Sequence, residues 1–355
     1  MRKDSKAKGE EIPLSFARGN GPIDESIDSL ISLAGGMENG EIVRELIIAA
    51  LKAGREGVSR GDLKLMNATL KEMRYTAKVF APYREVRKVT VFGSARTRPE
   101  EPIYDLAKAL GRDLARAGYM VITGGGAGIM QAANEGAGPS RSFGVNIRLP
   151  FEQKPNPVLD GLPTNINYKY FFNRKVAFVK EADAVVLFPG GFGTLDEAME
   201  VLTLVQTGKR EPMPIVLLDV PGGTYWETWR DFVEEELLAR GAVSPSDFSL
   251  FTHVTSGEDA LSHINLFYRR YHSMRFVGPH LVIRLKDFLN SKTLDRLNRD
   301  YADILTPGGE MSQSEALPQE EDEPGMLSLP RLLIPFNRKE YGRLRELIDA
   351  LNQDQ

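Results

Sequence analysis

The stretch Asp183-Ala-Val-Val-Leu-Phe188, followed by PGGFGTLDE at 189–197, decides the fold that we expect of this chain. The apolar run is typical of a buried strand, and residues 195–206 carry apolar side chains at helical spacing. Glycines between a strand and a helix leave several backbone N–H groups unpaired beside the positive end of the helix macrodipole. This arrangement predicts a phosphate-binding site.

Another glycine turn, TGGGAGIM at 123–130, is the first of the two in the chain; it follows an apolar run and has the same strand-turn-helix pattern. Neither turn is followed by Gly-Lys-Ser/Thr, so neither matches the phosphate loop of NTPases. We therefore expect the chain to bind a phosphorylated small molecule rather than to hydrolyse an NTP.

Strands and helices alternate from residue 87 to about residue 240. The pattern predicts strands at 89–92, 119–123, 143–149, 183–188 and 214–218, and helices at about 101–117, from 128, and at 168–181, 194–207 and 225–239. Such alternation predicts an α/β fold with a Rossmann-like, doubly wound parallel sheet. Ligands of such sheets bind beyond the carboxyl ends of the strands, where Gly93-Ser94 and both glycine turns are expected.

The 355 residues divide into four expected regions. Residues 1–20 are polar and are predicted to form a disordered tail, followed by a helical N-terminal extension at 21–86. The Rossmann-like domain covers 87–255, and a C-terminal extension covers 256–355. The extension is expected to hold helices at about 257–272, 287–304 and 338–352, a strand at 281–285, and a mobile linker rich in Pro, Gly and acidic residues at 307–325.

Within the N-terminal extension, helices are expected at about 24–34 and 41–54 and from Ser59 onward, where Ser59 and Asp62 form a capping-box pattern. The third helix carries an apolar stripe, which we interpret as a packing face rather than a cofactor site. The stripe consists of Leu63, Met66, Leu70, Met73, Ala77 and Phe80.

Composition narrows the chemistry that is open to the chain. With 42% hydrophobic and 26% charged residues and a net charge of -4, it resembles an ordinary soluble protein without a nucleic-acid partner. No apolar stretch approaches the ~20 residues that cross a bilayer, and we expect a cytoplasmic protein without a membrane partner. Zero cysteines and four scattered histidines give no metal-ligand pattern, so we expect neither metal nor cofactor. Catalysis would then use carboxylates, hydroxyls, Arg or Lys.

Residues 88–240 resemble the LONELY GUY (LOG) family of nucleotide N-glycosidases, once widely labelled lysine decarboxylases. The resemblance rests on PGGFGTLDE, which matches the family's PGGxGTxxE, and on the Arg174-Lys175 pair. The interval from Arg174 to Glu197 also matches that between the family's essential Arg and Glu.

Bacterial members supply further points of resemblance. TGGGAGIMQAANEGA is similar to their first glycine motif, and Leu149-Pro-Phe-Glu-Gln-Lys154 is similar to the loop that follows it. The two extensions resemble those of longer bacterial members, which are often described as AMP nucleosidases.

The resemblance implies hydrolysis of a nucleoside 5′-monophosphate, AMP foremost, to free base and ribose 5-phosphate. Glu197 would stabilise the ribose cation and orient or deprotonate the attacking water, as carboxylates do in glycosidases. Arg174 would supply positive charge to the phosphate, ribose or base. Glu200 is a second carboxylate candidate, and Asp196 stands where many relatives have Glu. The family also implies a homodimer or higher homo-oligomer.

A larger set of residues is assigned to the phosphate or sugar, and for several of them a second interpretation stays open. The set is Gly190, Gly191, Gly193, Thr194, Gly124, Gly125, Gly126, Gly128, Ser94, Lys175 and Glu200. The first glycine turn is equally well explained as a close turn beneath the second. Ser94 is as often a local turn-former, and Lys175 a solvated side chain.

Three functions from different classes fit these residues. The first is the nucleotide nucleosidase, whose nearest variant releases cytokinin bases from N6-modified AMP. The second is a binding protein that keeps the crevice without catalysis, like relatives that carry molybdenum cofactor; the presence of both Arg174 and Glu197 favours the enzyme. The third, a nicotinamide-dependent oxidoreductase, is least supported, because the dinucleotide fingerprint opens the first strand-helix unit and the long glycine motif here follows the second strand.

Overall fold

A computed structural model of the chain describes residue 19 and residues 21–149 and 154–353. Most of the predicted tail at 1–20, and residues 150–153 of the loop that resembles bacterial relatives, lie outside the described residues. The chain divides into two compact units, Met1–Lys71 and Glu72–Gln355.

The first unit is helical, as the sequence predicts. It contains α1 (Pro22–Leu33), α2 (Gly40–Arg55) and the beginning of α3 (Arg60–Phe80). The predicted cap is confirmed, because the Oγ of Ser59 accepts the N–H of Asp62 at 3.1 Å. A buried ion pair between Arg44 and Asp24 joins α2 to α1.

The apolar stripe of α3 differs from its interpretation as a packing face. Leu63, Met66 and Leu70 are exposed, and Phe80 at the end of the helix is buried. The aromatic ring of Phe80 stacks on that of Phe143 in the second unit's core, with ring centroids 4.3 Å apart. Within the described residues, the stripe is therefore packed only where α3 enters the second unit.

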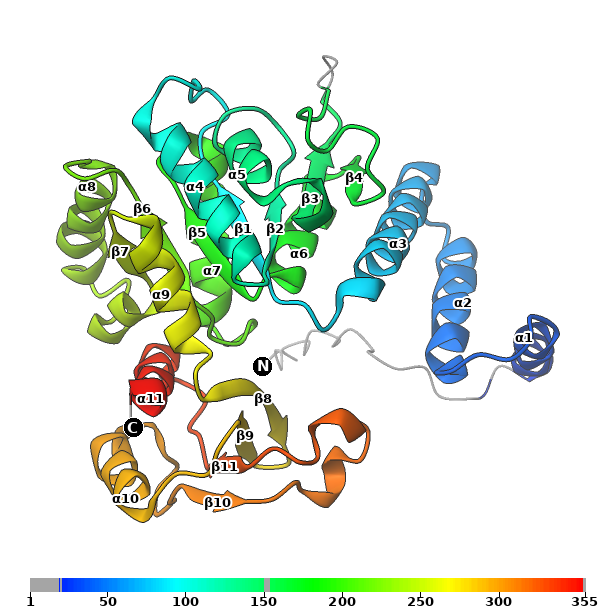
Figure 1. The fold of residues 1–355 in the computed structure, drawn as a ribbon. Helices are drawn as coiled ribbons and strands as arrows, with labels where there is room; N and C mark the ends of the chain where they lie inside the picture. The colour runs from blue at the N-terminus through cyan, green and yellow to red at the C-terminus, as the bar shows by residue number, and fades with distance from the viewer. Residues whose placement is uncertain (1–18, 20, 150–153, 354–355) are drawn as a thin grey trace, which may run out of the picture. The chain divides into compact units, whose positions relative to one another are not determined.

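A parallel sheet of seven strands lies at the centre of the second unit, in the order β4-β3-β2-β1-β5-β6-β7 (Figure 1). Its strands are β1 (Lys88–Phe92), β2 (Met120–Thr123), β3 (Ser142–Ile147), β4 (Asn165–Tyr168), β5 (Ala184–Leu187), β6 (Ile215–Leu218) and β7 (Thr252–Val254). The central strands β1, β2, β5 and β6 are buried throughout, as their runs of Val, Ile and Leu require in a sheet covered on both faces. The edge strands β4 and β7 were not predicted, because they are short and less apolar.

Helices cover both faces of this sheet, which confirms the predicted doubly wound α/β fold. On one face lie α4 (Pro102–Arg116), α5 (Ile129–Ala137) and α9 (Gly257–Phe267). On the other lie α6 (Phe171–Glu181), α7 (Phe192–Gln206) and α8 (Tyr225–Phe232).

The strand order reverses between β1 and β5. The chain adds β2, β3 and β4 on one side of β1 and then returns to add β5, β6 and β7 on the other. At such a reversal the loops that follow the two strands diverge and leave a crevice. The two loops still touch, since the N–H of Ser94 donates to the carbonyl of Pro189 at 3.1 Å.

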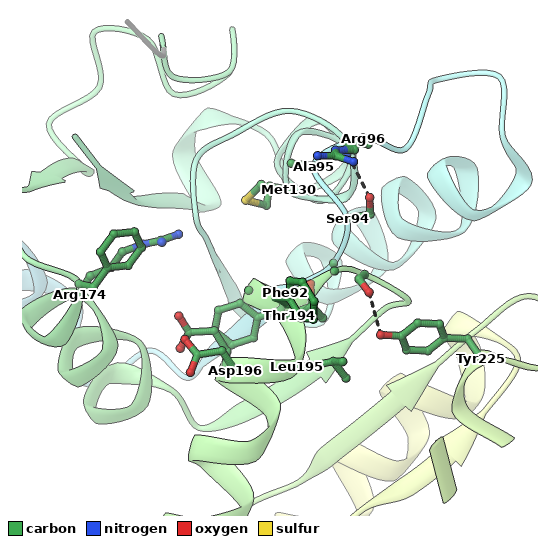
Figure 2. Close-up of a pocket in the computed structure, with 17 residues that line it drawn as sticks. Phe92, Ser94, Ala95, Arg96, Met130, Arg174, Thr194, Leu195, Asp196 and Tyr225 are labelled. Carbon is green, nitrogen blue, oxygen red and sulfur yellow. Dashed lines mark hydrogen bonds between the residues drawn. The ribbon is translucent and has the colours of Figure 1, made fainter. Parts of the chain in front are cut away.

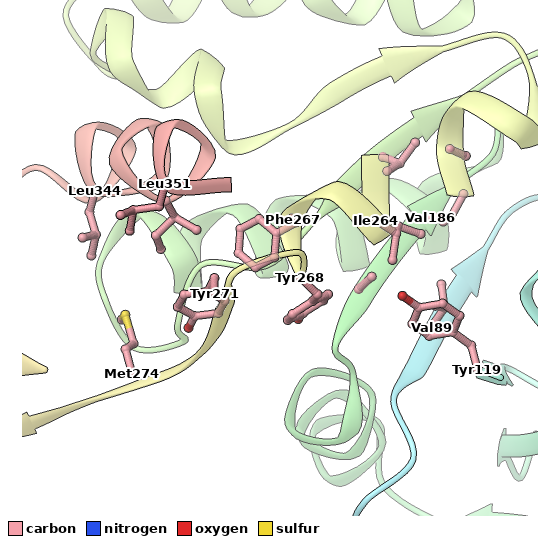
Figure 3. Close-up of a cluster of buried hydrophobic side chains, with 14 of the residues drawn as sticks. Val89, Tyr119, Val186, Ile264, Phe267, Tyr268, Tyr271, Met274, Leu344 and Leu351 are labelled. Carbon is pink, nitrogen blue, oxygen red and sulfur yellow. The ribbon is translucent and has the colours of Figure 1, made fainter. Parts of the chain in front are cut away.

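The C-terminal extension contains an antiparallel sheet of which the sequence predicted one strand, at 281–285. The strands are β8 (Tyr271–Val277), β9 (His280–Leu285), β10 (Ser312–Ser314) and β11 (Arg331–Ile334), in the order β10-β11-β9-β8, with helices α10 (Ser291–Asp300) and α11 (Tyr341–Gln353). Figure 3 shows the contact with the main core, where Leu344 and Leu351 of α11 approach Phe267 and Tyr271. The same hydrophobic core therefore runs from the parallel sheet into the extension.

The acidic segment 307–325 is not the mobile linker that its composition predicts. It supplies β10, and its Glu320 is fully buried. Glu320 accepts hydrogen bonds from Arg331 (2.9 Å) and from Arg284 (2.8 and 3.0 Å). Burial alone would raise the pKa of Glu320, but hydrogen bonds from Arg331, the backbone N–H of Leu317 and Arg284 lower it to about 2. The prediction was wrong because composition does not reveal the arginine partners, which lie on β9 and β11 outside the segment.

Candidate active site

A cavity of about 820 Å³ lies at the reversal point, beyond the carboxyl ends of β1 and β5 (Figure 2). It brings together seven of the residues that the sequence predicted: Ser94, Arg174, Gly190, Gly191, Gly193, Thr194 and Glu197. It also includes residues that sequence reasoning did not single out, among them Arg96, Phe171, Phe192 and Tyr225. Gly124, Gly125, Gly126, Gly128, Lys175 and Glu200 do not line it.

The glycine turn after β5 presents a helix N-terminus to this cavity. Helix α7 begins at Phe192 with Gly191 as its N-cap, and the first N–H groups of a helix have no partner within it. A Cβ atom added to Gly191 or Gly193 would meet no heavy atom within 4 Å, so space remains open beside the backbone. The hydroxyl of Tyr225 donates to the carbonyl of Gly190 at 2.7 Å and holds the turn in place. The turn is therefore suited to an anionic group.

The glycines of the turn after β2 lie behind the cavity wall, whereas Met130 at the end of this motif lines the cavity. A Cβ atom on Gly124 would lie 2.5 Å from Nη2 of Arg174, and a Cβ atom on Gly128 would lie 2.2 Å from the carbonyl oxygen of Ser94. The glycines thus let the backbone approach two residues that do line the cavity. Of the two interpretations left open for this turn, the geometry favours the close turn.

Glu197 is the buried carboxylate of the cavity. It lies in the second turn of α7, and the residue is only 6% exposed. Among the described residues, its Oε2 atom has no hydrogen-bond partner. Burial raises the pKa of Glu197 to about 7, although Lys175 and Arg174 oppose the shift. The raised pKa makes Glu197 a carboxyl that can take up or release a proton near neutral pH, and its Oε2 atom is itself buried, 3.8 Å from Nζ of Lys175.

The side chain of Arg174 reaches the cavity from α6, and two contacts hold it in place. Its Nε donates to the carbonyl of Val145 at 2.8 Å, and its guanidinium lies over the ring of Phe178, 5.0 Å from the ring centroid. Figure 2 shows the guanidinium pointing into the cavity. Burial lowers the pKa of Arg174 while the carboxylate of Glu197 raises it, and the guanidinium remains charged.

Lys175 does not line the cavity, and its ammonium group forms ion pairs with acidic side chains of α7. Its Nζ lies 2.7 Å from Oε2 of Glu200, 2.9 Å from Oδ2 of Asp196 and 3.8 Å from Oε2 of Glu197. Burial lowers the pKa of Lys175, but the bonds to Glu200 and Asp196 raise it above its ordinary value. Lys175 thus pairs with both Glu200 and Asp196. Asp196 lies at the exposed edge of the cavity and Glu197 in its wall.

Ser94 combines the two roles that the sequence left open. Its Oγ accepts the N–H of Arg96 at 3.1 Å, as in a local turn, and the residue also lines the cavity. Arg96 is exposed at the same loop and adds positive charge there. The sequence contained a signal for Arg96, since it ends the GSAR stretch after the first strand.

Two features are absent from residue 19 and from residues 21–149 and 154–353. No helix in these ranges is both long and apolar enough to span a bilayer. The same ranges contain no cluster of three His, Asp or Glu side chains that could hold a metal ion.

Several known proteins are similar to part of this chain. The profile of a family described as "Possible lysine decarboxylase" matches residues 126–264. The cytokinin riboside 5'-monophosphate phosphoribohydrolase LOG3 of Arabidopsis thaliana is 26% identical over 162 residues, which are 45% of this chain and 73% of the plant protein. The probable cytokinin riboside 5'-monophosphate phosphoribohydrolase LOGL9 of Oryza sativa subsp. japonica is 30% identical over 168 residues, 46% of this chain and 71% of the rice protein.

A solved structure is also similar to part of the chain. The molybdenum cofactor carrier protein of Chlamydomonas reinhardtii has 19% identity and a TM-score of 0.36, and the match covers 51% of this chain and 96% of that one. The profile match includes both Arg174 and Glu197, and the rice protein is matched over more than two thirds of its length. The chain belongs to the LONELY GUY (LOG) family.

Proposed function

We propose that residues 87–255 hydrolyse the N-glycosidic bond of a nucleoside 5′-monophosphate, AMP foremost, to free base and ribose 5-phosphate. The observation that carries this proposal is Glu197, a buried carboxyl in the wall of a cavity that also holds a helix N-terminus and the guanidinium of Arg174. The names of the plant relatives, which are phosphoribohydrolases, support the same reaction class.

In the proposed complex the phosphate binds at the beginning of α7. The N–H groups near Gly191 and Gly193 and the positive end of the helix dipole stabilise its charge. Ser94 and Arg96 approach from the loop after β1 and add a hydroxyl donor and a positive charge.

The ribose then lies towards Glu197. As the bond between C1′ and the base nitrogen breaks, its electron pair goes to the base and positive charge develops on the ribose ring. The carboxylate of Glu197 stabilises this charge and takes a proton from the water that attacks C1′; a proton is then returned to the base nitrogen, which gives the free base and leaves Glu197 ionised again. Arg174 offers guanidinium donors to the ribose hydroxyls or the leaving base. This chemistry requires no cofactor.

The base preference has a second candidate. The plant relatives are named for cytokinin riboside 5'-monophosphates, whose N6 substituent would need apolar surroundings. Phe171 and Phe192 provide exposed aromatic side chains at the cavity. We keep AMP as the first substrate and an N6-modified AMP as the alternative.

We also propose that the protein is a homodimer or a higher homo-oligomer. Phe171, Phe172 and Val176 of α6 are 53%, 47% and 45% exposed, an apolar surface beside the cavity that a second copy would cover. Light scattering at micromolar concentration should give at least twice the mass of one chain, and a single-chain mass would contradict the proposal.

A panel of nucleoside 5′-monophosphates tests the function directly. The full-length protein is incubated with AMP, the other common monophosphates and an N6-isopentenyl AMP, without added cofactor, and free base is measured by chromatography. We expect adenine and ribose 5-phosphate from AMP. Binding of AMP without release of base from any substrate would favour the carrier function instead.

A further inference from the structure

The first turn of α6, the helix that carries Arg174, is held by a residue of another helix. α6 begins at Phe171 with Tyr170 as its N-cap, and within the described part of the chain no side-chain hydrogen bond caps it. Its first turn also contains no acidic residue, although a negative charge stabilises the beginning of a helix. Glu72 of α3 supplies the negative charge that α6 lacks.

Two hydrogen bonds join the carboxylate of Glu72 to the beginning of α6. Oε1 accepts the N–H of Lys169 at 2.8 Å, and Oε2 accepts Nδ2 of Asn173 at 2.7 Å. Asn173 is only 2% exposed and directly precedes Arg174 in the chain. Hydrogen bonds to a carboxylate are stronger than those between neutral groups. The two bonds therefore fix the chain on both sides of the N-cap, Tyr170.

The next turn of α3 holds the strand that leads into α6. The hydroxyl of Thr76 donates to the carbonyl of Glu72 at 2.8 Å, so the phenol of Tyr168, which is also bonded to this hydroxyl, is the donor of that bond. Both Thr76 and Tyr168 are buried. Tyr168 ends β4 two residues before the N-cap of α6, so α3 fixes this connection at two successive points.

The end of α3 also contacts the strand that holds the side chain of Arg174. Phe80 stacks on Phe143 of β3. Val145 of the same strand accepts Nε of Arg174 at 2.8 Å. Arg174 thus lies between two elements, the first turn of α6 and strand β3, and α3 contacts both of them.

We propose that Glu72 is a positioning residue for Arg174, which fixes the first turn of α6 and thereby sets where the guanidinium lies in the cavity. Glu72 does not line the cavity, so its effect on the reaction passes through Arg174. The inference rests on the proposed function, in which Arg174 contacts the ribose or the base. It gives the last helix of the N-terminal extension a part in catalysis.

A double-mutant cycle measures whether Glu72 acts through Arg174. Adenine release from AMP is compared in the full-length wild type, Glu72→Ala, Arg174→Lys and the double variant. Glu72→Ala should lower kcat about tenfold and change KM less than about twofold, because charged hydrogen bonds are lost while the phosphate contacts at α7 remain. In the Arg174→Lys background the same substitution should lower kcat less than about twofold, since residues that act through one another are not additive.

The side chain of Arg174 can also be observed without substrate. In full-length protein with ¹⁵N-labelled arginine, Arg174→Lys identifies the Nε–H resonance of Arg174, because lysine has no such group. This N–H is bonded to the carbonyl of Val145 and should exchange slowly with solvent. Glu72→Ala should speed up the exchange about tenfold. Glu181→Gln is the matched control, since it removes a carboxylate from the other end of α6 and should leave the exchange unchanged.

Three results would overturn the proposal. The first is an unchanged kcat in Glu72→Ala, and the second is a loss of kcat that is as large in the Arg174→Lys background as in the wild type, which would indicate a general structural effect. The third is an unchanged exchange rate of the Arg174 Nε–H in Glu72→Ala.

Two further provisions keep the test decisive. If Glu72→Ala does not fold, Glu72→Gln replaces it; this variant keeps the size of the side chain and one acceptor oxygen, so the same changes are expected with smaller amplitude. If the wild type releases no base from any monophosphate, the proposed function is wrong, and the exchange of the Arg174 Nε–H still decides whether Glu72 positions Arg174.

Discussion

The two glycine turns have the same strand-glycine-helix pattern and opposite surroundings. The turn after β5 faces the large cavity, with open space beside Gly191 and Gly193. The turn after β2 is filled by the protein itself, since the N–H of Gly125 donates to Oγ1 of Thr123 at 3.0 Å and the carbonyl of Gly125 accepts the N–H of Asn156 at 2.8 Å. A glycine turn alone therefore does not identify a phosphate site.

Position in the sheet explains the difference. β5 flanks the point where the strand order reverses, so its following loop diverges from that of β1 and leaves room for a ligand. β2 lies one strand away, between β1 and β3, and its turn packs under the loop that carries Ser94. We infer that the first turn supports the site by positioning Arg174 and Ser94, whereas the second binds the ligand.

The largest expected effect comes from removing the carboxylate next to the open turn. Glu197→Gln keeps the size of the side chain but cannot take a proton or stabilise a cation, so kcat for AMP should fall by about 10²–10⁴-fold. The KM should change little, because the phosphate contacts remain. Release of adenine, measured by chromatography, gives both constants.

Asp196→Asn is the matched control for this change. Asp196 precedes Glu197 on α7 but is exposed and bound to Lys175, so kcat should fall less than about tenfold. Undiminished turnover in Glu197→Gln would remove Glu197 from the mechanism, and equal losses in both variants would indicate a shared role.

The next largest effect is on the stability of the protein and concerns the turn after β2. In Gly125→Ala, the new Cβ would lie 2.2 Å from Oδ1 of Asn146, at a backbone φ of +72° that L side chains rarely adopt. The free energy of unfolding should fall by about 2–4 kcal/mol. Urea denaturation measures it, and a midpoint equal to that of the wild type would contradict the close-packed description.

Gly193→Ala makes the same chemical change in the open turn, where it should act on binding instead. The added methyl meets no protein atom within 4 Å, and Gly193 lies in the first turn of α7, so stability should be kept or slightly increased. Because the methyl occupies the proposed phosphate position, KM for AMP should rise about tenfold, or ~1.4 kcal/mol. Unchanged steady-state constants would place the phosphate elsewhere.

Much of the fold was predictable because its signals are local. The apolar runs of β1, β2, β5 and β6 and the helical spacing after residue 195 depend on neighbouring residues in the chain. The buried Glu320 was not predictable, because its partner Arg331 lies on a strand that was not predicted, and nothing in the sequence pairs Glu320 with Arg284 on the strand that was. The antiparallel sheet of the extension was missed for the same reason, since three of its four strands lack a clear alternating pattern.

The residues of the candidate site were predictable where a sequence motif places them together. They were not predictable where their position depends on tertiary packing. PGGFGTLDE places Gly190, Thr194 and Glu197 together, and all three line the cavity. The sequence could not distinguish the open turn from the filled one, because Asn146 and Asn156, which surround the latter, lie on later segments. Tyr225, which holds the second turn, comes from a helix whose position depends on the whole sheet.

The smallest expected effect concerns the pH at which the carboxyl beside the open turn becomes active. The pKa of Glu197 is raised to about 7 by burial, so its ionised fraction, and with it kcat/KM, should rise as pH increases through about 7. The free energy of unfolding depends on pH in the opposite direction. Since the folded pKa lies above the unfolded value, the stabilisation from the bound proton is present at low pH and is lost as pH rises through about 7.

Lys175→Met tests what sets this midpoint. Lys175 lowers the pKa of Glu197 from outside the cavity, so its removal should raise that pKa further and move the midpoint of kcat/KM to higher pH. Lys180→Met is the matched control, since Lys180 also lies on α6 but pairs with Glu181 and is exposed. If the pH profile of adenine release is identical in the wild type and Lys175→Met, then Lys175 does not control the pKa of Glu197.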